Sequence, residues 1–173
     1  MSINEGLTGT ALTAAELRYE KNVTNISHSL PGWRTPTRRR LLVRLNWGCL
    51  AIMTAIAVAG YFWRPLILAW LPMTVAIIVF WTMLRIVIDM KDAAPARYLD
   101  EFETETLLRA RSRALSAVSG ILFAMAVILI FVSSLQLGDG HRLAYTAGAL
   151  SILAFFTAAV IPAAAMARTM NDE

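Results

Sequence analysis

The sequence predicts an all-α integral membrane protein with four transmembrane helices arranged as two hairpins. Of its 173 residues, 57% are hydrophobic, against about 45–50% in an ordinary soluble domain. These residues gather into four long blocks instead of recurring at the spacing of an amphipathic helix or strand. The connections after the first and third blocks are very short, which favours two helical hairpins.

The four blocks define the expected spans. The first covers residues 45–63 and the second covers 66–84, with nineteen uncharged residues in each. At about 1.5 Å per residue, this length nearly matches a hydrocarbon core of about 30 Å. The third span is expected over 114–138 and the fourth over 143–167, and both are long enough to cross.

Lysine and arginine are distributed unevenly between the two sides of these spans. Residues 1–44 carry seven of them, the central connection 85–113 carries six and the tail 168–173 carries one, whereas each short loop carries one. Loops rich in Lys and Arg usually stay in the cytoplasm. We therefore expect the amino-terminal segment, the central connection and the tail to be cytoplasmic.

The basic residues lie beside the apolar blocks of a chain whose net charge is +4. No nucleic-acid-binding module is recognisable, so no nucleic-acid partner is expected, and anionic membrane lipids are the more economical partner. The expected contacts with lipid headgroups are the arginines that precede the first and third spans, namely Arg38, Arg39, Arg40, Arg109, Arg111 and Arg113.

The expected spans contain no Asp, Glu, Lys, Arg or His. Intramembrane ionisable groups usually mark proton relays, ion pathways and transport sites, so their absence argues against a pump or a coupled transporter. The single cysteine, Cys49, leaves no disulfide framework and no metal site of several cysteines. The sequence predicts no catalytic residue, no metal and no cofactor, and the chain is not expected to be an enzyme.

Small residues recur every four positions on three of the expected helices. Such stripes let helix backbones approach closely, which is how helices associate in lipid. We expect the stripes to pack inside the chain, and packing against another subunit is the alternative. The stripes are Ala51, Ala55 and Ala59; Ser116, Gly120 and Ala124; and Ala159, Ala163 and Ala167.

The central connection has the pattern of a charged cytoplasmic helix over residues 95–113 that runs directly into the third span. Its acids come first and its arginines last, as the helix dipole favours, and Glu105 should pair with Arg109 one turn later. One interpretation is a charged extension of a membrane helix. The other is a docking surface with Leu99 and Phe102 as its apolar contacts.

This segment also carries a resemblance. Leu99-Asp100-Glu101, then Glu103 and residues 109–114, resemble the charged helix of many small uncharacterised actinobacterial multi-span membrane proteins. Those proteins have Leu-Asp-Glu-Arg-Glu before an arginine- and alanine-rich start of a span, and Phe102 stands here in place of the arginine. The resemblance implies a bacterial cell membrane as the location and brings no activity with it.

Several local features lead to further expectations. Residues 13–16 match a capping box, so a short helix is expected over 14–21. The amino-terminal segment as a whole should be disordered or ordered by a partner.

Prolines inside the second and fourth spans should kink them. Trp81 should pack between helices, and Arg85 and Asp89, one turn apart, should form an ion pair. The two prolines are Pro72 and Pro162.

Together these features favour a non-catalytic accessory subunit of a larger bacterial membrane complex. By analogy, an actinobacterial respiratory-chain assembly is one candidate host, and the expected partners are membrane lipids and other membrane-protein subunits. The alternative is a homo-oligomeric channel, a holin-like protein or a transporter component. Its pore would be lined by hydroxyl groups, with Asn46 or Gln136 near the ends.

Overall fold

The computed structural model describes residues 14–26, 29–135 and 139–170, and these residues form helices, short turns and connections without any strand. The all-α prediction is therefore confirmed over the described chain. Four helices are each long and apolar enough to cross a membrane, as the four apolar blocks predict.

The long helices are joined by short 3-10 turns. A 13-residue helix, α1 (Ala14–Ile26), precedes them. The long helices are α2 (Pro36–Phe62), α3 (Trp70–Val87), α4 (Glu101–Ser134) and α5 (Gly140–Thr169). The turns are η1 (Pro31–Trp33), η2 (Arg64–Ala69), η3 (Lys91–Ala93) and η4 (Ala96–Tyr98).

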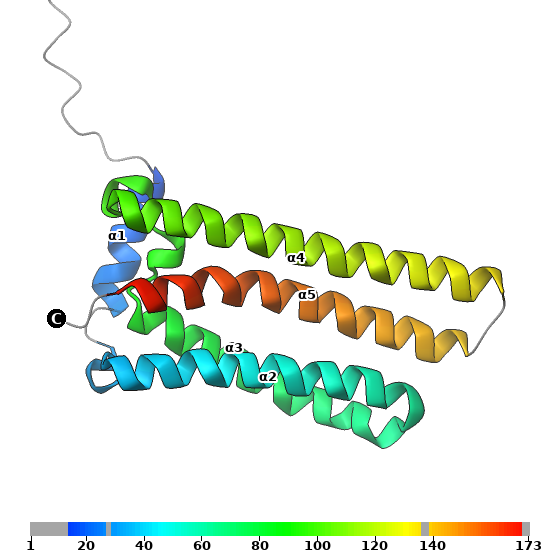
Figure 1. Cartoon of the computed structure of the whole chain (residues 1–173). Coiled ribbons are helices and arrows are strands. Elements are labelled where there is room, and N and C mark those ends of the chain that lie inside the picture. The colour runs from blue at the N-terminus through cyan, green and yellow to red at the C-terminus, as the bar shows by residue number, and fades with distance from the viewer. Residues whose placement is uncertain (1–13, 27–28, 136–138, 171–173) are drawn as a thin grey trace, which may run out of the picture.

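The helix α5 is the centre of the arrangement because it packs against α2, α3 and α4. The helices α2 and α3 also pack against each other, whereas α4 packs mainly along α5 (Figure 1). The helix α1, the start of α4 and the carboxyl end of α5 lie at the same end of the molecule (Figure 1). The connections after α2 and α4 lie at the opposite end.

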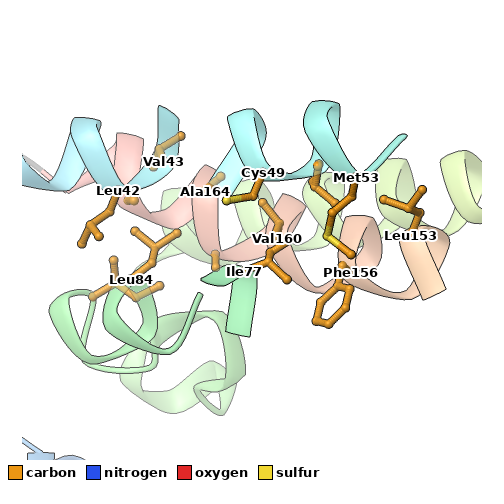
Figure 2. Close-up of a cluster of buried hydrophobic side chains, with 14 of the residues drawn as sticks. Leu42, Val43, Cys49, Met53, Ile77, Leu84, Leu153, Phe156, Val160 and Ala164 are labelled. Atoms are coloured by element: carbon orange, nitrogen blue, oxygen red, sulfur yellow. The ribbon is translucent and has the colours of Figure 1, made fainter. Parts of the chain in front are cut away.

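The core lies between α2, α3 and α5, whose apolar side chains converge there (Figure 2). Its largest members are completely shielded from solvent because each helix turns a row of branched or sulfur-containing side chains inward. These fully buried residues include Leu42 and Met53 of α2, Ile77 and Leu84 of α3, and Val160 and Met166 of α5.

The second transmembrane helix begins later than expected, for a local reason. Residues 66–69 belong to η2, and α3 begins only at Trp70. Pro72 is therefore in the first turn of α3, where the missing N–H has no partner to lose. The expected kink at Pro72 is wrong for this reason, whereas Pro162 does lie inside α5.

The charged connection does not form a helix from residue 95. Residues 96–98 form η4, and α4 begins at Glu101 behind its N-cap, Asp100. The Asp100 Oδ1 accepts a hydrogen bond of 2.6 Å from the backbone N–H of Glu103, which fixes this start. From there one continuous helix runs to Ser134, a length of about 50 Å.

Polar groups within the apolar helices are largely satisfied by the chain itself. Trp81 of α3 donates from its Nε1 to the backbone oxygen of Ala159 in α5 at 3.2 Å, so the expectation that Trp81 packs between helices is confirmed. Asn46 is completely buried and donates to the backbone oxygen of Leu42 at 2.9 Å. Back-bonding of this kind is how polar side chains are tolerated in apolar helices.

Candidate functional site

One end of the molecule gathers ion pairs from segments that are distant in the sequence. The helix α1, the turns η1, η3 and η4, and residues 101–107 of α4 meet there, beside the start of α2 and the end of α5 (Figure 1). We call this assembly the polar cap. It is the most elaborate polar structure in the described part of the chain and is the candidate functional site.

The helix α1 rests on η4. The Tyr98 hydroxyl donates to Glu20 Oε1 at 2.5 Å, the rings of Tyr19 and Tyr98 are 5.1 Å apart, and Arg97 lies 4.0 Å from Glu16. The expectation that this segment is disordered or needs a partner is therefore wrong for residues 14–26, because its own chain supports it. The helix also extends beyond residue 21 to Ile26, and Thr13 of the expected capping box lies outside the described residues.

The chain leaves α3 through a strained turn. Asp89 and Met90 have φ angles of 51° and 54°, a left-handed conformation that side chains other than glycine adopt rarely. The guanidinium of Arg34 donates to both carboxylate oxygens of Asp89, at 2.8 and 3.2 Å. The Tyr19 hydroxyl donates to the Asp89 backbone oxygen at 3.2 Å. Such strain persists where surrounding contacts over-determine it.

This turn changes the expected ion pairing. Because Asp89 faces Arg34, Arg85 pairs with Asp92 at 3.0 Å, and the expected Arg85–Asp89 pair is wrong. The backbone oxygen of Asp92 also accepts a hydrogen bond of 2.8 Å from Arg111 of α4. An ion pair between Lys91 and Glu103 adds a second link. The turn η3 is thus fastened to both α3 and α4.

Titratable groups of the polar cap respond to these surroundings. Burial raises the pKa of Asp92, although the nearby Arg85 and Arg111 oppose the shift. The hydrogen bond to Glu20 raises the pKa of Tyr98 to about 12. Burial raises the pKa of Tyr19 as well, and Asp89 adds to that shift. Cations and anions neutralise each other here, an arrangement suited to holding segments together.

The two expected apolar contacts of the polar cap are in different environments. Leu99 is partly buried and packs against the core of its own chain. Phe102 is 64% exposed, so it alone presents an apolar surface of the kind that a docking partner could cover.

The arginines at the start of α2 have separate roles. Arg38 donates to the backbone oxygen of Gly32 at 2.5 Å and lies over the ring of Trp33. Arg39 is only 6% exposed and donates to the backbone oxygen of Met170 at 2.8 Å, which ties α2 to the end of α5. Arg38 and Arg40 are both exposed, and their expected contact with lipid headgroups stays a prediction.

The arginines of α4 are also divided. Arg109 pairs with Glu105, as the sequence predicts. Arg111 serves the polar cap through Asp92, as described above, and Arg113 is exposed. Arg109 and Arg111 thus contact different parts of the chain, and the expected contact of the three arginines with lipid headgroups stays a prediction.

The small-residue stripes face in different directions. Ala163 and Ala167 of α5 are buried, as internal packing requires. The expectation of internal packing is wrong for the other two helices, where Ala51 and Ala55 of α2 and the whole stripe of α4 are exposed. A Cβ atom placed on Gly120 would meet no atom of the described chain within 4 Å. The exposed stripe of α4 consists of Ser116, Gly120 and Ala124.

The Arg34–Asp89 link could not be read from local sequence patterns, because 55 positions separate its members. The N-cap of α4 was readable, since an Asp three residues before a Glu is a common helix start.

In comparisons with known proteins, the chain matches no family model, no curated protein and no solved structure.

Proposed function

We propose that this chain is a non-catalytic subunit of a larger bacterial membrane assembly, to which α4 attaches it. The observation that carries the proposal is the exposed small-residue stripe of α4. None of the most apolar stretch of α4 is buried within the described chain, and α4 packs mainly along α5. A second helix is therefore free to lie against the stripe.

The chemistry of the stripe favours a protein over lipid as its neighbour. Lipid tails accommodate large side chains well, whereas small side chains matter where two helix backbones approach closely. Glycine within a helix also costs about 1 kcal/mol relative to alanine. Gly120 has no neighbour among the described residues that would explain that cost, so a close helix of another subunit is the better account.

The proposed orientation places the polar cap in the cytoplasm. It is supported by the excess of Lys and Arg in the segments that make up this end of the molecule. The start of α2 and the end of α5 share that end (Figure 1), so both chain ends would face the cytoplasm. The location would be the bacterial cell membrane, crossed four times, with α2–α3 and α4–α5 as the two hairpins.

The two other classes of function have weaker support. An enzyme needs reactive groups that are free to act, and three acids of the polar cap are engaged by Arg34, Arg85 and Lys91. A channel formed by several copies was expected to have Asn46 or Gln136 near the ends of a pore lined by hydroxyl groups. The Asn46 side chain is completely buried inside the bundle, and Gln136 lies outside the described residues.

The test is to extract the tagged native protein in a gentle detergent and to identify what accompanies it by sizing and mass spectrometry. We expect stoichiometric recovery with a larger complex, whose members would show whether the host belongs to the respiratory chain. Recovery of this chain alone, as a homo-oligomer, would contradict the proposal and place the channel class first.

Matched variants connect this test to α4. Ala124→Leu enlarges the stripe, whereas Ala126→Leu makes the same change at the same depth on another exposed side of the helix. We expect Ala124→Leu and Gly120→Leu to reduce co-purification at least tenfold, and Ala126→Leu to leave it unchanged. Unchanged thermal unfolding of each purified variant would show that the fold survives. Equal co-purification of all variants would remove α4 as the attachment site.

A further inference from the structure

A pocket of about 250 Å³ lies where α2 begins and α5 ends. Its basic lining comes from both helices: Arg40 and Arg44 lie one turn apart on α2, and Arg168 lies in the last turn of α5. Two buried apolar residues, Val43 and Ala167, complete the lining. None of these five residues is acidic, so the described lining combines basic side chains from both helices with two apolar residues.

The packing of the two helices does not require these charges. Arg39, the neighbour of Arg40, already ties α2 to α5 through the backbone oxygen of Met170. Arg168 interacts favourably with the negative end of the α5 dipole. This interaction does not require its side chain to face the pocket. Arg44 and Arg168 are exposed and form no ion pair with the described part of the chain. Because Arg44 and Arg168 converge on one pocket, an anion is the occupant that fits it best.

The position of the pocket identifies the class of anion. It lies at the end of two helices that are apolar enough to cross a membrane, and basic pockets between membrane helices on the cytoplasmic side bind anionic headgroups. Planar guanidinium groups match phosphate oxygens two at a time. Trp47, which follows Arg44 by one turn on α2, is 40% exposed and is of the residue type that prefers the level of the headgroups.

We propose that this pocket binds the phosphodiester of an anionic phospholipid such as phosphatidylglycerol or cardiolipin. Arg44 and Arg168 hold the phosphate from the two helices. The glycerol and acyl chains continue along α2 past Trp47, while Val43 and Ala167 form the apolar floor. The proposal assigns Arg44 and Arg168 to lipid binding and does not depend on whether the chain belongs to a larger assembly.

Thermal unfolding of the full-length protein in a mild non-ionic detergent tests this assignment. Phosphatidylglycerol, phosphatidylcholine and inorganic phosphate are titrated separately. We expect phosphatidylglycerol to raise the unfolding temperature by several degrees, since a ligand that binds only the folded state stabilises it. We expect no rise with phosphatidylcholine or with inorganic phosphate. A rise with inorganic phosphate alone would show a site for a free anion and overturn the lipid assignment.

The double variant Arg44→Gln/Arg168→Gln isolates the pocket. At about fivefold per arginine, the phosphatidylglycerol concentration for the half-maximal rise should increase about thirtyfold. The matched control, Arg109→Gln/Arg113→Gln, removes the same charge from α4 and should retain the wild-type midpoint. If the double variant does not fold, Arg168→Gln alone should raise the midpoint about fivefold. An equal midpoint for the pocket variants and the control would overturn the proposal.

Discussion

At the end of α3, two residues other than glycine adopt left-handed backbone conformations, and the polar cap is built around them. The turn at Asp89 and Met90 is held by Arg34 on one side and by Tyr19 on the other. These two contacts bring η1 and α1 to the same point. A residue pair that is unfavourable locally is thus maintained by tertiary contacts, and the position of α1 depends on them.

Loss of the Arg34 side chain should loosen α1. In Arg34→Met the half-buried carboxylate of Asp89 loses its cation, at a cost of about 1 kcal/mol. We expect backbone amides of residues 14–26 to exchange with deuterium about fivefold faster. Arg113→Met, which removes an exposed arginine elsewhere, should leave that exchange unchanged. Equal exchange in both variants would show that Arg34 does not hold α1.

The Tyr98 hydroxyl should titrate at unusually high pH. Its pKa is raised from 10.0 to about 12 by the hydrogen bond to Glu20. Because the folded pKa is above the unfolded one, this contact stabilises the fold fully below pH 10 and loses its effect as the pH rises towards 12. The ultraviolet absorbance of tyrosinate, compared between wild type and Tyr98→Phe, should show this phenol. In Glu20→Gln its pKa should fall towards 10, and an unchanged value would contradict the assignment.

Among the elements, α4 shows most clearly how a helix boundary is set. Its start is fixed by a single side-chain acceptor, and its charged residues and its apolar residues belong to one uninterrupted helix. The polar cap is therefore joined rigidly to the helix that carries the exposed small-residue stripe. Anything that moves the first turn of α4 also moves the stripe.

Removal of the N-cap should destabilise the first turn of α4. In Asp100→Ala the backbone N–H of Glu103 loses its acceptor, which typically costs about 1 kcal/mol. Asp100→Asn keeps a side-chain oxygen at the same place and should retain most of the stability. Thermal unfolding in detergent should therefore give a lower midpoint for the alanine variant only. The same midpoint for both variants would show that the cap does not limit stability.

The long helices were predictable from the sequence, whereas the polar cap was not. Runs of about nineteen apolar residues have few alternatives to a helix in a membrane, so composition alone identifies them. Their boundaries shifted where a local signal competed, as at Pro72 and Asp100. The pairing of Arg34 with Asp89 depends on a left-handed turn and on the packing of distant segments. Neither leaves a periodic pattern in the chain.

On the scale of the whole molecule, charge and apolar surface are separated. The polar cap collects several ion pairs at one end, whereas the pair of Arg142 with Asp139 lies at the other. The core lies between α2, α3 and α5 (Figures 1 and 2). The helix α4 stands at the edge of this core with much of its apolar surface uncovered. Such a shape agrees with the proposal that lipid and a neighbouring subunit cover α4.

The proposed orientation can be tested with single cysteines. In a background in which Cys49→Ala removes the native thiol, Thr37→Cys and Gly140→Cys place an exposed thiol at opposite ends. We expect a membrane-impermeant maleimide to label Gly140→Cys in intact cells and Thr37→Cys only after permeabilisation. The reverse pattern would invert the orientation, and labelling of both sites in intact cells would contradict four complete crossings.

The central position of α5 has a consequence for biosynthesis. This helix is the last of the four to leave the ribosome, yet it contacts the other three and supplies Val160 and Met166 to the core. Until α5 is inserted, the inward faces of α2 and α3 remain uncovered in the bilayer and α4 lacks its main neighbour. The nascent chain therefore stays accessible to membrane chaperones and proteases until α5 has been translated.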